Sequence, residues 1–399
     1  MTNLALGQTK SLSPALVLLM AVSCGLTVAN LYYNQPLLAD IGQTFGVDDR
    51  HAGIISMLTQ IGYAAGMFLF IPLGDIYEKR RLITALLFAV GVALIGVAAA
   101  QNLTWIYIAS LAVGVTTVAP QMIVPLVAEL ALPHERGKAI GNVMSGLLIG
   151  ILLARTVAGL IGELFHWRVM FGLAAVMMFG LALILRSYLP GSQQQLKLSY
   201  KELIRSMGHL IASQRTIREA SLIGAFMFGS FSVFWTSLTF YLEGPTYQYG
   251  SAVAGLFGLV GVVGSAAASV IGRLADRISP IRMIGFMIAA ALLSYVSFWL
   301  LGSMIWGLVA GVILLDLGIQ GGQVSNQARI YSLLPEARSR INTIYMVSSF
   351  LGGAVGSAAG AYAWSLWAWA GTCAVGGGMV AVAFLIWLGH RQGGRKQAA

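Results

Sequence analysis

The chain has 399 residues, of which 58% are hydrophobic and only 10% are charged. A soluble globular protein averages about 25% charged residues, so this chain has too few charges to cover its surface in water. The same numbers exclude a disordered chain and, despite a formal net charge of +10, a nucleic-acid binder. We therefore expect most of the chain to lie in a lipid bilayer.

Apolar runs long enough to cross a bilayer follow one another along the chain. A spanning helix needs about 20 predominantly apolar residues, and charges, prolines and turn residues divide the sequence into twelve such runs. They are too long and too little alternating for barrel strands, which predicts an all-α membrane protein. The expected transmembrane helices are 14–38, 51–74, 82–100, 104–130, 138–163, 168–189, 217–242, 251–274, 281–302, 304–331, 340–363 and 367–389.

The longest polar segment, 190–216, separates the sixth run from the seventh. Ser199 and Glu202 have the spacing of a capping box, and the apolar residues that follow at helical spacing predict a short amphipathic helix on the membrane surface. We thus expect an N-terminal six-helix bundle over 1–189, this linker, and a C-terminal six-helix bundle over 217–399.

Lys and Arg are unevenly divided between the two sides of this topology. With the N-terminus in the cytoplasm, 21 of the 24 basic residues fall in cytoplasmic segments, and only Arg50 and Arg168 fall on the outer side. Basic residues accumulate on the cytoplasmic side of membrane proteins, so both termini are expected inside the cell.

The two halves repeat each other at a nearly constant offset. Gln121 matches Gln323 and Gly150 matches Gly352, 202 residues later in both cases. A Pro-x-x-Arg pattern follows the fourth and tenth runs, and an aspartate closes the second and the eighth. Parallel repeats of this kind place a substrate site at the bilayer midplane, between halves that rock against each other.

Twelve spans, a six-plus-six repeat, a central cytoplasmic loop and a charged motif after spans two and eight resemble the major facilitator superfamily over essentially the whole chain. The segment Leu31-Tyr32-Tyr33-Asn34-Gln35-Pro36 is similar to bacterial efflux-type members, the drug:proton antiporters and arabinose exporters. The resemblance implies a monomeric secondary transporter of the bacterial inner membrane that exports a small organic solute in exchange for protons, without cofactor or metal. A symporter importing a polar or anionic metabolite is the alternative, and a membrane-embedded enzyme or receptor is a remote one.

The resemblance further implies a gate at the cytoplasmic ends of the helices. An aspartate there can contact the positive N-terminal end of another helix, and a contact made in only one conformation biases the inward–outward equilibrium. Glu129, at the inner end of span four, is expected to form a salt bridge with a loop arginine. The expected gate residues are Asp75, Lys79, Arg80, Arg81, Glu129, Arg136, Gly272, Asp276, Arg277 and Arg338.

Two charged residues, Arg155 in span five and Asp316 in span ten, lie too far inside their spans to reach an interface. A charge within the bilayer costs several kcal/mol and marks a pathway or a pair. The two lie at similar depths, roughly 12 and 18 Å from the outer ends of their helices. Arg155 could hold a polar or anionic substrate group and Asp316 could exchange a proton, or the two could form a permanent salt bridge.

Polar and aromatic side chains gather at this depth on the spans that line the cavity of the resembling family. Asn30 and Asn34 are expected to share one face of span one. The predicted substrate-binding residues around the proton-coupling residue Asp316 are Arg155, Asn30, Asn34, Gln121, Phe231, Trp235, Gln320, Gln323 and Asn326.

Glycines recur at four-residue spacing, as in Gly62-x3-Gly66 and Gly352-x3-Gly356-x3-Gly360. Small residues at this spacing let helices approach closely. Because spans two and eleven meet across the two halves of the family's fold, as do five and eight, the resemblance implies that these glycines form sliding surfaces between the halves.

Overall fold

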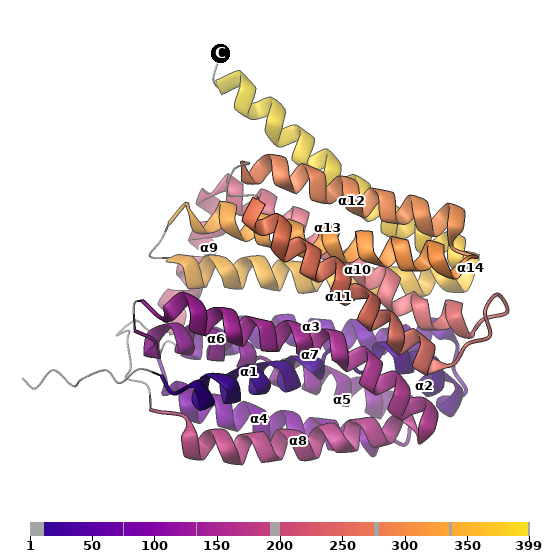
Figure 1. Cartoon of the computed structure of the whole chain (residues 1–399), viewed down its shortest axis with the longest axis horizontal. Helices are drawn as coiled ribbons and strands as arrows, with labels where there is room; N and C mark the ends of the chain where they lie inside the picture. The colour runs from indigo at the N-terminus through magenta and orange to yellow at the C-terminus, as the bar shows by residue number, and fades with distance from the viewer. Residues whose placement is uncertain are drawn as a thin grey trace, which may run out of the picture.

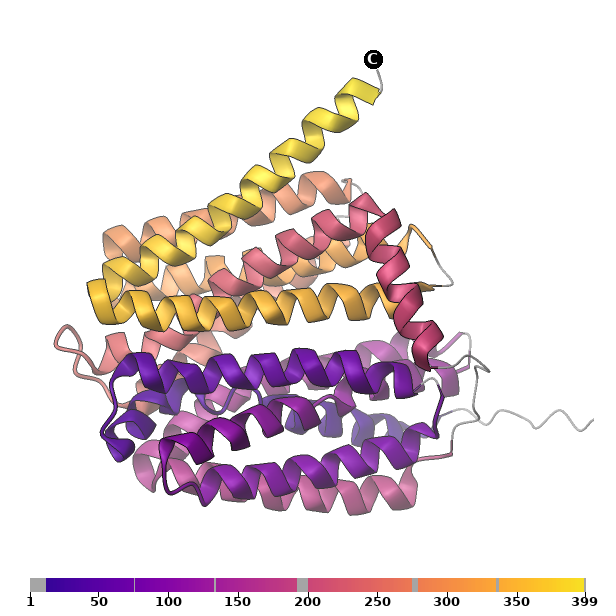
Figure 2. The same ribbon diagram turned by 180° about the vertical axis from the view of Figure 1, so that it is seen from behind.

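The protein, seen here in a computed structural model, is described over residues 12–74, 76–132, 134–191, 200–274, 279–334 and 337–397. Throughout these ranges the regular structure is helical, as predicted, and the helices form two bundles that lie side by side (Figure 1, Figure 2). The first bundle contains α1 (Pro14–Ala29), η1 (Gln35–Leu37), α2 (Leu38–Phe45), α3 (Asp49–Gly74), α4 (Lys79–Ala98), α5 (Leu103–Thr116), α6 (Ala119–Leu130), α7 (Arg136–Leu164) and α8 (Trp167–Tyr188). After α9 (Tyr200–Ser213), the second contains α10 (Arg215–Glu243), α11 (Ser251–Leu274), α12 (Pro280–Leu301), α13 (Ile305–Tyr331) and α14 (Arg338–Gln397).

The described helices account for the twelve predicted membrane crossings. Nine segments of the described residues are long and apolar enough to cross a membrane, and Pro14–Ala29 and Ser251–Gly261 are shorter apolar helices. One of the nine, Arg338–Gly389, reverses direction at Trp367 and Ala368, where the backbone leaves helical geometry and φ of Ala368 reaches +47°. This segment therefore crosses twice.

Proline interrupts two of the predicted spans. α1 ends at Ala29, and turns lead into η1, because Pro36 has no N–H to donate to a helical partner and its ring clashes with the preceding turn. Asn30 and Asn34 therefore do not share one face of a continuous helix, contrary to the prediction. Pro120 divides span four into α5 and α6 for the same reason.

Each bundle has its own apolar core, and a few helices join the bundles. Within the first bundle α4 packs on α8, α3 on α5 and α1 on α7, while in the second α10 packs on α14 and α12 on α13. The main contacts between bundles are those of α3 with α14 and of α7 with α11. The charged side chains predicted for the site lie on or beside these boundary helices.

The helix α9 lies across the boundary between the bundles at one end of the molecule, which we call the linker end; the opposite end is the far end (Figure 2). The apolar residues Leu203, Met207 and Leu210 of α9 are buried, and Met207 and Leu210 belong to a cluster with residues of α10, α13 and α14. α9 is thus amphipathic as predicted, but its apolar face packs on the second bundle. Ser199 of the predicted capping box lies outside the described residues.

Most of the glycine stripes pack within a bundle, contrary to the prediction. A Cβ added at Gly62 would lie 2.3 Å from the carbonyl oxygen of Leu111 on α5, and one at Gly356 would lie 2.1 Å from the carbonyl oxygen of Gly229 on α10. The stripe on α11 is different, because Gly255 faces α7 of the other bundle. The spacing predicted close approach correctly but did not identify the partner helix.

Replacing Gly150 by alanine is expected to destabilise the first bundle. The new Cβ would lie 2.2 Å from the carbonyl oxygen of Gly25 on α1, and overpacking of this kind costs about 1–3 kcal/mol. Gly180→Ala is the matched control, because no atom lies within 4 Å of a Cβ there. Thermal unfolding in detergent should show a lower midpoint for Gly150→Ala alone, and equal midpoints would contradict the packing described.

Candidate functional site

Arg155 is buried at the boundary between the bundles, with 1% of its surface exposed. Its Nε donates a hydrogen bond to Oε1 of Gln35 at 2.6 Å. The guanidinium carbon lies 4.0 Å from the ring centre of Trp235 on α10 and 4.7 Å from that of Tyr32, with Phe231 further off at 5.5 Å. The interruption of span one places Tyr32 and Gln35 against this guanidinium, and Arg155 thus lies in a cage of aromatic rings from both bundles.

Asp316, on α13, is equally buried, with 1% of its surface exposed. It packs against α11, where a Cβ added at Gly261 would lie 3.2 Å from Oδ2 of the carboxyl group. On the same helix, a Cβ at Gly258 would lie 3.0 Å from Cβ of Arg155. Gly258 and Gly261 lie one turn apart on the same side of α11, and they let both charged residues approach this helix closely.

The two charges lie near each other without pairing. Each is close enough to act electrostatically on the other, yet no salt bridge joins them among the ion pairs of the described residues. Nη2 of Arg155, Oδ2 of Asp316 and Nε1 of Trp235 are buried and have no hydrogen-bond partner in the described part of the chain. A buried polar atom without a partner costs about 1–3 kcal/mol, and a charged one costs more, so these atoms can bind polar groups of a ligand.

The other predicted binding residues are less closely gathered. Asn34 donates to Oγ1 of Thr59 at 3.1 Å, and Gln121 donates to the hydroxyl group of Tyr63 at 3.1 Å, both within the first bundle. Asn30 contacts Sδ of Met178 at 3.3 Å. On the second bundle, Gln323 contacts Sδ of Met346 at 3.7 Å, Asn326 is buried and Gln320 is half-buried.

Gln35 and Tyr32 contact Arg155 directly but were not predicted as site residues. The available signal was Pro36, which implies a broken helix whose side chains and backbone turn toward the site. Hydropathy does not distinguish Gln35 from the other uncharged polar residues of the sequence.

Hydroxyl and amide groups join the bundles beside this site. Gln60 of α3 donates to Oγ of Ser357 on α14 at 2.7 Å and accepts from Ser232 of α10 at 3.0 Å. Thr236 donates to the same Ser357 oxygen at 2.9 Å. We call these residues the hydroxyl seam, and all of them are buried: Ser56, Gln60, Ser232, Thr236 and Ser357. It was not predicted, although its residues recur at i, i+4 on α3 and α10.

Carboxylates and aromatic side chains close the far end. Asp49 accepts a hydrogen bond from Trp364 at 2.7 Å, Glu163 accepts from the N–H of Ala252 at 2.8 Å, and Glu243 accepts from Gln43 at 3.4 Å. Each of these contacts joins the first bundle to the second. Arg50 also lies over the ring of Tyr362, with its guanidinium carbon 4.7 Å from the ring centre.

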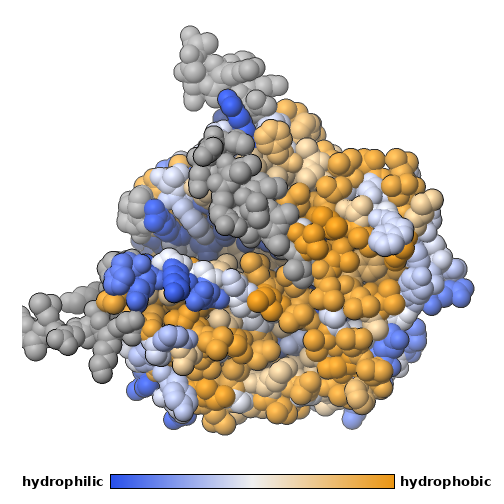
Figure 3. All heavy atoms as spheres, in the orientation of Figure 1, coloured by the Kyte–Doolittle hydropathy of each residue, from blue (hydrophilic) through white to orange (hydrophobic). Residues whose placement is uncertain are grey.

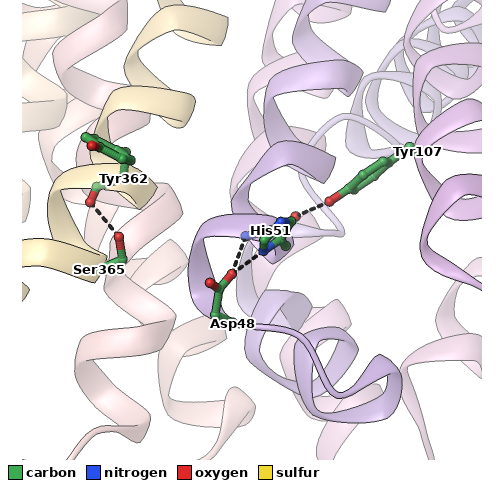
Figure 4. A network of polar contacts seen from close by, with 5 residues as sticks. All are labelled: Asp48, His51, Tyr107, Tyr362 and Ser365. Atoms are coloured by element: carbon green, nitrogen blue, oxygen red, sulfur yellow. Dashed lines mark hydrogen bonds and ion pairs between the residues drawn. The ribbon is translucent and has the colours of Figure 1, made fainter.

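The start of α3 is braced by the contacts in Figure 4. Asp48 accepts from the backbone N–H of His51 at 2.9 Å and lies 2.5 Å from its Nδ1, and Tyr107 donates to the carbonyl oxygen of His51 at 2.8 Å. The hydrogen bonds from His51 lower the pKa of Asp48. The helix end that faces Tyr362 and Ser365 of α14 is thereby held in position.

At the linker end, the predicted gate residues bind within their own bundles. Glu129 pairs with Lys79, which begins α4, rather than with the predicted loop arginine. Arg80 and Arg81 both pair with Glu78, Arg338 donates to the carbonyl oxygen of Tyr331 at 3.2 Å, and Arg136 is exposed. Gly272 lies in α11; Asp75, Asp276 and Arg277 lie outside the described residues.

Comparison with known proteins identifies relatives over nearly the whole chain. Residues 17–328 match the family model described as Major Facilitator Superfamily. The uncharacterized transporter YgaY of Escherichia coli O157:H7 is 40% identical over 383 residues, which cover 96% of this chain and 97% of that protein. A probable sugar efflux transporter of Helicobacter acinonychis is 23% identical, with 81% of each chain covered.

A solved structure has the same fold. The inward-facing, unoccupied crystal structure of a bacterial homolog of the human lysosomal transporter Spinster superposes with a TM-score of 0.75 at 16% identity. The superposition covers 94% of this chain and 97% of the other.

Proposed function

We propose, from the premise that this chain belongs to the Major Facilitator Superfamily, that it exports a small polar organic solute in exchange for protons by alternating access. The chain is a transporter, since its family and its relatives are transporters and not enzymes. The proposal rests on two opposite charges, Arg155 and Asp316, which are buried where the bundles meet and form no ion pair with the described residues.

The unpartnered atoms favour a hydroxyl-rich solute. Nη2 of Arg155 and Nε1 of Trp235 can donate to hydroxyl oxygens, and Oδ2 of Asp316 can accept from a hydroxyl group. The relative named as a probable sugar efflux transporter supports this class.

Competition between solute and proton for Asp316 would couple solute export to proton import. A carboxylate without a compensating group costs several kcal/mol in the membrane interior. Asp316 must therefore hold either a proton or a hydrogen-bond donor of the solute, and binding of one favours release of the other. The neighbouring Arg155 stabilises the ionised state during the exchange.

Alternating access requires the halves to separate at one end while they meet at the other. In this structure the cross-bundle hydrogen bonds of Asp49, Glu163 and Glu243 close the far end. At the linker end, by contrast, the described ion pairs of Lys79 and Arg329 lie within single bundles. Solute would enter from the linker end, which the distribution of basic residues assigns to the cytoplasm.

Vesicle transport tests the proposal and its direction. A thermal-shift screen of sugars, polyols and amino acids on the purified protein would select the solute. In inside-out vesicles an acidic lumen should drive solute uptake by the wild type. Uptake only into right-side-out vesicles with acid outside would favour the importing symporter, and turnover without a second compartment would contradict transport.

Closure of the far end is expected to depend on pH through Asp40 of α2. Burial, with a further contribution from Glu163, raises the pKa of Asp40, although a hydrogen bond from Ser251 and the nearby His166 act in the opposite direction. Glu243 of the other bundle also faces this carboxylate. Because the pKa is higher in the closed state, closure takes up a proton and is favoured as pH falls and lost as pH rises through the raised value.

Spin labels at Gln101 and Thr246, exposed on opposite bundles at the far end, would measure this closure. Both native cysteines are buried, which directs labelling to the introduced ones. The closed fraction should fall as pH rises above the ordinary pKa of an aspartate in the otherwise wild-type protein, and it should change less in Asp40→Asn. Asp48→Asn is the control, since the pKa of Asp48 is lowered. An unchanged profile in Asp40→Asn would contradict this role.

A further inference from the structure

A long groove lies on the first bundle, away from the charged site. It has a volume of about 970 Å³ and runs along α1 between α7 and α8. Its lining is mostly apolar, with Leu18 and Val22 from α1, Ile149 and Leu153 from α7, and Leu173 from α8. The groove therefore suits an occupant with extended hydrocarbon.

The groove opens toward the hydrocarbon of the membrane. Leu18 is 64% exposed and Ile149 is 56% exposed, which is unusual for side chains along the length of a cavity but expected for those that face acyl chains. Figure 3 shows apolar side chains across most of this face, with polar side chains at the linker end. In Figure 1, α1 is visible between α7 and α8 on the same face.

The end of the groove nearest the linker end is polar and carries charged side chains of both signs. Its lining there includes His134, Glu135, Lys138 and Asn142. Lys138 lies in the first turn of α7, where the helix dipole also favours an anion, and it has no ion pair among the described residues. Glu135 lies 3.8 Å from Nε2 of His134. Apolar walls that lead to a lysine at a helix N-terminus match an amphiphile whose phosphate can bind there.

We propose that this groove binds one anionic phospholipid, with its acyl chains along α1 and its phosphate at Lys138 and the first turn of α7. The groove ends beside the charged site, because its wall includes Tyr33 and Ala154, the neighbours of Tyr32 and Arg155. The bound lipid therefore supports the interrupted part of span one from behind. This binding is independent of the solute and of proton coupling.

Native mass spectrometry of the purified full chain tests this site. Protein delipidated in detergent is titrated with phosphatidylglycerol or phosphatidylethanolamine of matched acyl chains. The wild type should bind one phosphatidylglycerol per chain and prefer it to phosphatidylethanolamine. Lys138→Ala should weaken phosphatidylglycerol about fivefold, the effect of one basic residue at an anionic lipid surface.

A second pair of variants tests the apolar part. Ile149→Trp places a large side chain in the groove and should remove the single tight binding event. Leu183→Trp is the matched control, because Leu183 is 68% exposed on α8 but lies outside the groove; for the charge, Arg136→Ala is the control from the same helix end. Equal binding by Ile149→Trp and Leu183→Trp, equal affinity for the two lipids, or no retained lipid at all would each overturn the proposal.

Discussion

Asp316→Asn is expected to abolish solute accumulation driven by a pH gradient while leaving solute exchange between equal compartments. Asparagine keeps the size and the hydrogen-bonding capacity of the side chain but cannot release a proton. The wild-type carboxyl group is buried, with one oxygen unpartnered among the described residues. Accumulation in liposomes should fall to the level of protein-free controls, and counterflow of labelled solute should persist.

The matched control for this variant is Asp48→Asn at the exposed far end, where the carboxylate binds His51. Its accumulation should stay close to that of the wild type. If Asp316→Asn still accumulates solute fully in response to a pH gradient, the proton-coupling role is wrong. If Asp316→Asn also loses counterflow, the carboxyl group is needed to bind the solute itself.

Arg155→Ala is expected to weaken solute binding by at least about 30-fold, equivalent to about 2 kcal/mol. The change removes a donor and leaves Oε1 of Gln35 and the ring of Trp235 without their partner. Arg155→Lys should restore the charge but only part of the affinity, since lysine lacks the planar group that stacks on Trp235. Isothermal titration with the screened solute measures both.

Arg168→Ala is the control for Arg155→Ala, because it removes an arginine–tryptophan contact outside the charged site. Its guanidinium carbon lies 4.3 Å from the ring centre of Trp167, and it also donates to the carbonyl oxygen of Ala100 at 2.9 Å, but it lies away from the charged site. Solute affinity should be unchanged in this variant. Unchanged affinity in Arg155→Ala would instead assign Arg155 a structural role.

The sequence predicted the architecture well because hydropathy acts over whole helices. Twenty apolar residues leave a chain few alternatives in a bilayer, and a charge amid them is conspicuous. For this reason Arg155 and Asp316 could be singled out without any structure. Whether they form a salt bridge could not be predicted, because that depends on how α7 and α13 each pack on a third helix, α11.

The predictions failed where the answer depended on which partner a residue meets. Gly62 was assigned to the boundary between halves, but it packs on α5. Glu129 was expected to bind an arginine, but Lys79 lies closer because it begins the neighbouring helix α4. Hydrogen-bonding residues such as Gln35 carry no signal of their own until the direction of the chain around Pro36 is known.

The hydroxyl seam joins the two bundles through hydrogen bonds between neutral side chains. Gln60, Ser232, Thr236 and Ser357 are all uncharged, and each neutral hydrogen bond contributes only about 0.5–1.5 kcal/mol net. Breaking one buried ion pair can cost 3–5 kcal/mol, so a charged contact here would slow the exchange of conformations by orders of magnitude. At this part of the boundary, neutral side chains therefore oppose separation of the halves less than a buried ion pair at the same position would.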